Sequence, residues 1–141
     1  MNIQVLLADY AQSDDRGKIN AIGVGWSTVP TPLPQHAVAV IFQADWHESN
    51  ERHPFTLELI DEDGALVTLP NEEGEENPLL NLQGEFEVGR PPGLAKGTPL
   101  LQTLAVNMPP GMPLAPAHRY EYRVTVGDVS SSATFSVTQL F

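Results

Sequence analysis

Hydrophobic and polar residues alternate strictly along residues 119–126, and a second, looser alternation follows over residues 129–140. Side chains on a β-strand point alternately to opposite faces, so each run predicts a strand with one buried and one solvated face. Only Gly127-Asp128 separates the two runs, which is typical of a two-residue type II′ hairpin turn. We therefore predict a hairpin with these cross-strand pairs: Val126 with Val129, Val124 with Ser131, Tyr122 with Ala133, Tyr120 with Phe135, Arg123 with Ser132, and Glu121 with Thr134.

Further short runs of strand character occupy the rest of the chain, and none of them shows an apolar stripe of helical period. Thirteen prolines and eleven glycines place turn signals between the runs. Nine strands are expected, at residues 2–10, 18–28, 36–46, 55–61, 65–69, 83–89, 100–108, 119–126 and 129–140. This pattern predicts a single all-β domain over residues 1–141, an antiparallel two-sheet β-sandwich of the immunoglobulin-like kind, with a closed β-barrel as the alternative.

The connection between the predicted strands 55–61 and 65–69 can be argued from its register. A three-residue loop, Glu62-Asp63-Gly64, would place Leu59 opposite Val67 and Leu57 opposite Leu69, so that apolar residues meet. A loop of this length requires Gly64 to adopt a positive φ angle at a bulge. Two other local features are expected. Residues 71–78 should form an acidic, poorly ordered loop, and alternation in the second strand should place Ile22, Val24 and Trp26 on one face.

The composition narrows the classes of partner. Eighteen acidic residues against seven basic ones give a net charge of −11, which disfavours binding to nucleic acid or to an anionic membrane surface. The chain has no cysteine, which excludes disulfides, thiolate zinc sites and cysteine nucleophiles. The apolar run Val5-Leu6-Leu7-Ala8 is too short for a signal peptide or a membrane span. A cytoplasmic location without a bound cofactor is expected.

Two groups of residues suggest metal binding. Asp61 and Asp63, together with the glutamates of residues 72–76, are the kind of carboxylates that calcium prefers, but neither possible reading frame fits an EF-hand loop. His47 and His53 flank a polar loop that also contains Asp45, Glu48 and Glu51, and such side chains could hold zinc. The spacing matches no strong metal motif, and the plainer interpretations are a charged turn and surface histidines. His36 and His118 lie beside proline-rich connections and predict no role.

Two aromatic residues and one proline-rich segment have competing interpretations. Trp26 and Trp46 are side chains that could stack against a sugar, but both fall in phase with predicted core faces, which favours burial. The segment 90–95, Arg-Pro-Pro-Gly-Leu-Ala, has two interpretations: an extended peptide that docks on a partner, and a stiff crossing between sheets. No nucleophile–base pair can be assigned from the sequence.

Several phrases occur together in the chain, among them Gly-Lys-Ile-Asn-Ala-Ile-Gly-Val-Gly-Trp at 17–26 and Phe-Glu-Val-Gly-Arg-Pro-Pro-Gly at 86–93. In this order they resemble a family of small bacterial proteins of unknown function. The resemblance covers nearly the whole chain, and the segment 86–93 is its most specific part. It implies one free-standing β domain, and it implies no activity and no site residue.

These observations favour a non-enzymatic protein-interaction or structural module, because the edge strands of a sandwich can pair with another copy of the chain or with another protein. The alternative is a small-ligand or carbohydrate-binding β-sandwich. A hydrolytic or metal-dependent enzyme comes third, and the cluster of His47, Glu48, Glu51 and His53 is the only one that we nominate for it.

Overall fold

A computed structural model describes residues 1–139 of the chain. Within these residues the elements are strands and one short 3-10 turn, with no helix long and apolar enough to cross a membrane. The elements are β1 Asn2–Ala8, β2 Tyr10–Ser13, β3 Ile19–Ile22, β4 Thr28–Val29, β5 His36–Ala44, η1 Trp46–Glu48, β6 Arg52–Asp61, β7 Thr68–Pro70, β8 Glu76–Pro78, β9 Asn81–Glu87, β10 Leu100–Met108, β11 Arg119–Val126 and β12 Val129–Val137. The all-β prediction is confirmed.

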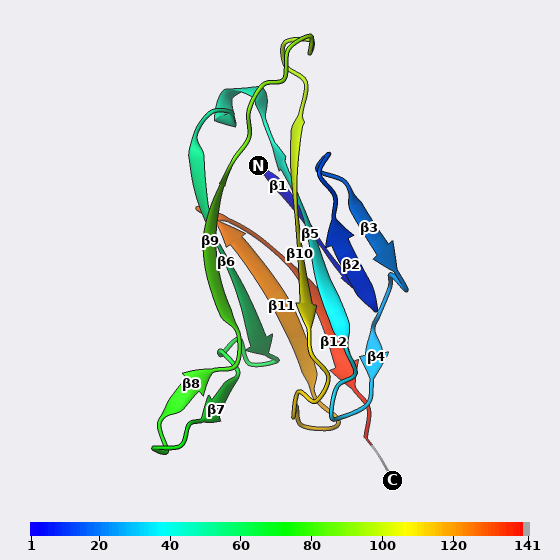
Figure 1. Ribbon diagram of the computed structural model, residues 1–141. Coiled ribbons are helices and arrows are strands. Elements are labelled where there is room, and N and C mark those ends of the chain that lie inside the picture. The colour runs from blue at the N-terminus through cyan, green and yellow to red at the C-terminus, as the bar shows by residue number, and fades with distance from the viewer. Residues whose placement is uncertain (140–141) are drawn as a thin grey trace.

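Two larger sheets pack face to face around a shared core (Figure 1). The first, here called the β5 sheet, has the strand order β1-β5-β10, and the second, the β11 sheet, has the order β4-β12-β11-β6-β9. Neither closes on itself, so the barrel alternative is wrong for the described residues. The strands pair antiparallel except β4, which runs parallel to β12. The largest fully buried side chains come from both sheets: Tyr122, Phe42, Phe135, Leu33, Leu57, Leu59, His36, Val29, Val38, Val40, Val124 and Val137.

The β11–β12 hairpin has the predicted register. Val126 lies opposite Val129, Tyr122 opposite Ala133, and Tyr120 opposite Phe135. Gly127 has φ 59°, the positive value that the two-residue turn requires. The second strand ends at Val137, short of the predicted end at residue 140, and residue 140 itself lies outside the described residues.

The turn after β6 is the predicted three-residue loop, but the strand expected after it is not formed as predicted. Gly64 has φ 82°, and the Val67 N–H donates to the Leu59 carbonyl at 3.0 Å. The chain then leaves β6, so that the expected pairing of Leu57 with Leu69 is wrong, and Leu57 lies opposite Leu82 of β9 instead. Leu69 belongs to β7, which pairs with β8. Part of the stretch 71–78, expected to be an irregular loop, therefore forms the turn and second strand of a small hairpin.

One turn design recurs at three places in the chain. Asp14, Asp61 and Asn71 each accept, through Oδ1, hydrogen bonds from the backbone N–H groups two and four residues later. In each case a glycine three residues after the Asx residue has a positive φ angle. The side chain thus satisfies backbone donors that the tight loop leaves without a strand partner, which explains why an acidic or amide residue precedes each loop.

The predicted strand 18–28 is wrong beyond Ile22. Gly23 and Gly25 have φ angles of 69° and 105°, which are incompatible with a continuous strand, and a Cβ on Gly23 would clash with the carboxylate of Asp9. Ile22 and Val24, expected on a shared face with Trp26, are instead 69% and 53% exposed, whereas Trp26 is half-buried. The strand expected at 2–10 is also divided, into β1 and β2, at Asp9.

The β2–β3 hairpin, residues 10–22, is hereafter called the flap, and it covers part of the outer face of the β5 sheet (Figure 1). Ala11 of the flap is fully buried against Ala37 and Ala39, whose methyl groups allow the backbones to approach closely. The side-chain amide of Asn107 on β10 holds the flap by accepting from the Ala11 N–H at 3.3 Å and donating to the Ala11 carbonyl at 2.8 Å. The flap therefore has one buried face and one face turned to solvent.

Candidate functional site

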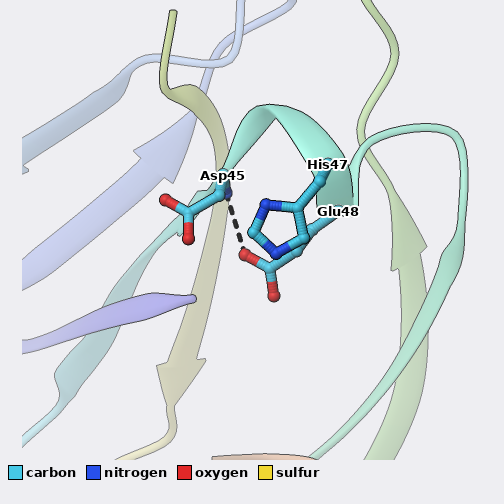
Figure 2. A group of neighbouring side chains, drawn as sticks. All are labelled: Asp45, His47 and Glu48. Atoms are coloured by element: carbon cyan, nitrogen blue, oxygen red, sulfur yellow. Dashed lines mark hydrogen bonds between the residues drawn. The ribbon is translucent and has the colours of Figure 1, made fainter. Parts of the chain in front are cut away.

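The predicted zinc ligands lie at one end of the fold, where β5 passes through η1 into β6. Asp45, His47 and Glu48 project from this turn, and their ligand atoms lie within 4.8 Å of one another (Figure 2). Glu48 Oε1 accepts hydrogen bonds from the Asp45 N–H and from the Met1 ammonium, each at 2.9 Å. The backbone hydrogen bond from Asp45, followed by that from the ammonium, holds the pKa of Glu48 below its ordinary value.

This geometry has a chemical consequence for metal binding. A histidine and two carboxylates are ligands that zinc accepts. However, the Met1 ammonium is already paired with Glu48 and lies 3.8 Å from Asp45 Oδ2, so a metal ion would compete with a resident cation. A zinc site at Asp45, His47 and Glu48 stays a prediction.

The other members of the predicted zinc set do not join this group within residues 1–139. His53 Nε2 hydrogen-bonds the Glu48 carbonyl at 2.8 Å, and because a carbonyl only accepts, this nitrogen carries the proton. The His53 ring also lies against Phe86, with ring centroids 5.3 Å apart. Glu51 is exposed in the loop beyond η1. His53 is thus an anchor for the turn rather than a neighbour of His47 in a ligand set.

The predicted calcium ligands have a structural use. Asp61 Oδ1 accepts from the N–H groups of Asp63 and Ala65, at 2.9 and 3.0 Å, and thereby caps its own turn. Glu76 Oε2 accepts from the Thr68 hydroxyl at 2.8 Å across the β7–β8 pair. In the part of the chain that the structure describes, no three metal-ligand atoms converge here. Calcium binding by Asp61, Asp63 and the 72–76 glutamates also stays a prediction.

Beside that turn lies a histidine–carboxylate pair that the sequence did not single out. His118 Nδ1 and Glu62 Oε1 are 2.6 Å apart, and this hydrogen bond lowers the pKa of Glu62. The pair borders a hollow of about 350 Å³, and an adjoining hollow of about 170 Å³ shares Arg119 and Tyr120 with it. The residues are 56 positions apart in the chain, so no local spacing pattern could have shown that they meet.

A second pair that the sequence missed is buried between the sheets. His36 of β5 has no exposed surface, and its Nε2 lies 2.7 Å from the Tyr122 hydroxyl of β11. Its Nδ1 lies 2.9 Å from the Pro34 carbonyl, so Nδ1 is protonated and Nε2 accepts from Tyr122. Burial lowers the pKa of His36 and raises that of Tyr122. Both groups are therefore neutral at neutral pH.

Each tryptophan ring is partly covered by a nitrogen-containing side chain, Trp26 by a histidine and Trp46 by an arginine. Trp26 stacks on His36, with centroids 4.5 Å apart and an interplanar angle of 11°. The Arg90 guanidinium lies 4.5 Å from the centre of the Trp46 ring, and Arg90 Nη2 donates to the Trp46 carbonyl at 2.8 Å. Both tryptophans are half-buried, and Trp46 lies in η1 rather than in a strand. The predicted burial is thus partial, and each ring has one face covered by a neighbour.

Arg90 also holds the segment 86–93, the most specific part of the family resemblance, against the turn around η1. Its Nε donates to Ser49 Oγ, and the nearby Asn50 N–H donates to the Val88 carbonyl at 2.8 Å. These contacts fasten the start of the β9–β10 connection to η1. Beyond them residues 91–97 are all exposed, and Leu94 is 40% exposed. The segment therefore crosses from the β11 sheet to the β5 sheet and also presents an exposed apex.

Replacing Arg90 by lysine is expected to lower the free energy of unfolding by about 1 kcal/mol, because an ammonium cannot both cover Trp46 and donate along a planar fork. Chemical denaturation measures this change. The matched control is Arg52→Lys, since Arg52 is 77% exposed and makes only a 3.5 Å contact with Glu85. The control should change stability by less than about 0.5 kcal/mol. Equal effects of the two substitutions would contradict the role given to Arg90.

A family model, DUF6941, described as a family of unknown function, matches residues 4–138. The chain belongs to DUF6941. This confirms the family resemblance inferred from the sequence, and the DUF6941 match spans both sheets, the flap and the β7–β8 hairpin. No curated protein matches the chain, and no solved structure matches it. DUF6941 membership assigns no activity, so a function must be argued from the surfaces and sites described above.

Proposed function

We propose that this DUF6941 chain is a non-enzymatic protein-interaction module and that the flap is its binding surface. The observation that carries the proposal is the composition of the outward face of the flap. Its cross-strand pairs are Tyr10 with Ile22 and Gln12 with Asn20, so the strand part of this face is uncharged, and the charged residues of the flap lie in its turn, at residues 14–18. Depletion of charge together with exposed aromatic and aliphatic side chains is the composition of interface cores.

The exposed apolar side chains support this choice of surface. Tyr10 is 42% exposed, Ile22 69% and Val24 53%. Ile22 is the most exposed large hydrophobic side chain among residues 1–139. By contrast, the two hollows beside Glu62 and Arg119 open to solvent and are lined largely by charged and polar residues, which suits a binding module better than an enzyme with a closed cleft.

We also propose that the fold is immunoglobulin-like. In support, the order β12-β11-β6-β9 corresponds to G-F-C-C′, and β1-β5-β10 corresponds to A-B-E. Tyr120 is the second residue of β11, and its hydroxyl accepts from the Ala115 N–H at 3.0 Å, like the tyrosine corner at the start of strand F. Two residues later, Tyr122 hydrogen-bonds His36 of β5 where such domains often carry a disulfide between strands B and F. We also propose a cytoplasmic location, which fits a chain that has a hydrogen bond and no cysteine at this position.

A second candidate function is binding of a small ligand in the hollow beside His118 and Glu62. The specific observation is that an imidazole, four carboxylates and the Arg119 guanidinium line adjoining hollows. Such a set would suit a small molecule that carries both charges. His118→Ala and Arg119→Ala should then weaken binding in a small-molecule thermal-shift screen, while flap variants should not.

The main proposal is tested by affinity capture from native cell extract with the wild-type chain, Ile22→Lys and Leu101→Lys. Leu101 is 57% exposed on β10 and is a matched control for adding a charge to an exposed aliphatic position. We expect a partner that is retained by the control and lost with Ile22→Lys, and, with purified components, binding at least about tenfold weaker for Ile22→Lys. Equal binding of all three chains would overturn the flap as the binding surface.

A further inference from the structure

We propose that the edge of β10 is a second binding surface of this chain, and that it takes up an extended peptide segment of another protein whose last residues are acidic. β10, Leu100–Met108, lies at one edge of the β5 sheet and pairs with β5 alone among residues 1–139 (Figure 1). Its other edge presents backbone N–H and C=O groups that an added strand can satisfy. This surface is distinct from the strand face of the flap, because the peptide would pair with the body of the sandwich.

Several features distinguish β10 from the other edge strands. It is nine residues long, pairs with β5 in an uninterrupted register and contains neither charge nor proline, so it lacks the devices by which proteins usually protect an edge. β1 is equally uncharged, but its Leu7 carbonyl already accepts hydrogen bonds from the N–H groups of Gly25 and Trp26. β9 carries Glu85 and Glu87, and β3 has only four residues. β10 is therefore the longest unprotected edge in the part of the chain that the structure describes.

The hydrophobic core is incompletely covered beside this edge. Leu104 and Val106 pack against the core from β10, yet both are only partly buried, whereas their β5 partners Val40 and Val38 are fully buried. A strand added at the edge would cover these side chains with apolar residues at alternate positions. In the immunoglobulin-like correspondence proposed above, β10 takes the place of strand E. Constant-type domains carry strand D beside it, and no strand of residues 1–139 lies there.

Basic side chains gather where β10 begins, although the chain as a whole is acidic. Arg16 of the flap turn and Arg90 of the β9–β10 connection border a hollow of about 460 Å³ at this point. The hollow also reaches two consecutive residues of β10, whose side chains point to opposite faces of the strand, so it lies at the strand edge. Lys18 and Lys96 follow in the same two segments, which thus contain four of the seven basic residues of the chain.

The acidic residues near this point do not cancel the basic ones. The flap turn contains Asp14 and Asp15, and Glu87 borders the hollow, so three acidic residues stand beside the four basic ones, and the rest of the chain holds fifteen acidic and three basic residues. Asp14 is also occupied, because its Oδ1 accepts from the N–H groups of Arg16 and Lys18. The Arg16 side chain forms no ion pair within residues 1–139, so its guanidinium can receive a carboxylate from a partner.

The free edge and the basic hollow together specify the occupant. A small anion would use the hollow but not the edge, and a neutral peptide would use the edge but not Arg16. An extended segment with alternating apolar residues followed by acidic residues uses both. If this segment pairs antiparallel to β10, its last residues lie beside the start of β10, where Arg16 can bind their carboxylates.

Fluorescence anisotropy tests the proposal with the full chain and a labelled peptide, Ser-Val-Thr-Val-Ser-Val-Asp-Glu, amidated at its C-terminus. We expect saturable binding to the wild type and at least about fivefold weaker binding to Arg16→Glu, because a charge-assisted contact becomes a repulsive one. The matched control is Arg123→Glu, which changes the net charge equally on β11 of the other sheet. It should bind within about twofold of the wild type, since distant surface charges are screened. No saturable binding to the wild type, or equal losses in the two variants, would overturn the proposal.

Two altered peptides separate the contribution of the edge from that of the hollow. A peptide ending in Asn-Gln lacks the carboxylates and should bind the wild type more weakly, with no further loss on Arg16→Glu. A peptide with N-methyl groups on the Thr and the Val that follows it loses a backbone donor towards β10 in either register, and it should not bind detectably. Full binding of the Asn-Gln peptide would overturn the role of Arg16, and full binding of the methylated peptide would overturn strand addition.

Amide hydrogen exchange locates the bound peptide. The amides of residues 100–108 should exchange more slowly with the peptide present, whereas those of residues 19–22 should not change. Ile22→Lys should bind the peptide like the wild type, because the strand face of the flap takes no part, so this result is independent of the capture experiment. Peptide binding without protection at β10, or binding that is lost in Ile22→Lys, would overturn the β10 edge as the site.

Discussion

Replacing Phe42 by alanine is expected to lower the free energy of unfolding by about 3–5 kcal/mol, a large part of the total stability of a small domain. Phe42 lies in the central strand of the β5 sheet and is 1% exposed. Its ring stacks on Phe86 of β9, with centroids 4.4 Å apart, and lies 5.5 Å from Phe55 of β6. Truncation would therefore remove contacts that join the two sheets and leave a cavity between them.

Urea denaturation followed by circular dichroism measures the effect of Phe42→Ala. The matched control is Leu101→Ala, because Leu101 projects from the other face of the same sheet and is 57% exposed. The control should lie within about 0.5 kcal/mol of the wild type. A loss below about 1 kcal/mol for Phe42→Ala would mean that the sheets are not joined through this aromatic cluster.

Replacing Tyr122 by phenylalanine is expected to cost about 1–3 kcal/mol, because His36 Nε2 would remain buried without a hydrogen-bond donor. The hydroxyl adds little to packing, so the cost comes from the unsatisfied nitrogen. Removing both polar partners in His36→Leu/Tyr122→Phe should recover part of the loss, since apolar replacement of a whole hydrogen-bonded pair is much less costly than replacement of one partner. If the double variant showed the summed cost of the two single variants, the pair would not be coupled.

The same pair predicts an acid sensitivity. The pKa of His36 lies below its ordinary value of 6.5 because the buried ring is desolvated. As the pH falls below about 6.5, the unfolded chain binds a proton at this residue and the folded chain does not, so the free energy of unfolding decreases. It continues to decrease until the pH reaches the lower pKa of the folded state. Stability therefore rises with pH across this window.

The pH dependence is measured by denaturation at a series of pH values between about 6.5 and 5.5, more than one unit above the ordinary glutamate pKa of about 4.3. The double variant His36→Leu/Tyr122→Phe is the reference, since it retains His47, His53 and His118, and the buried imidazole is the one histidine that it loses. The wild type should lose more stability than this reference on acidification. Parallel curves for the two chains would show that His36 does not contribute to the acid sensitivity.

Local chemistry determined the β11–β12 hairpin and the turn that follows β6. The register of β11 and β12 follows from alternation on both sides of Gly127-Asp128, and the loop ending at Gly64 follows from matching Leu59 with Val67. Both depend on residues close together in the chain, where turn length fixes register. The alternation over residues 119–126 also places Tyr122 on the apolar, buried face of its strand, because periodicity records which face of a strand is buried.

Alternation does not record which strands become neighbours. Leu57 pairs with Leu82 rather than Leu69, because β6 has a longer partner in β9 than in the chain that follows its turn. The end of β3 at Ile22 depends on Asp9, whose carboxylate fills the space beside Gly23. The apolar spacing of Ile22 and Val24 suggested a buried face, but the flap buries its alanines instead.

The candidate sites depended on the tertiary structure for the same reason. Asp45, His47 and Glu48 are near neighbours in sequence, and their grouping on one turn could be anticipated. His36 and Tyr122 are 86 positions apart, and Arg90 and Trp46 are 44 apart. The first pair forms only when the two sheets stack, and the second only when the β9–β10 connection lies against η1. The sequence by itself therefore determined the strand character of most elements, the turn types and the buried face of the final hairpin, whereas sheet pairing, the exposed flap and the long-range pairs of side chains were decided by packing.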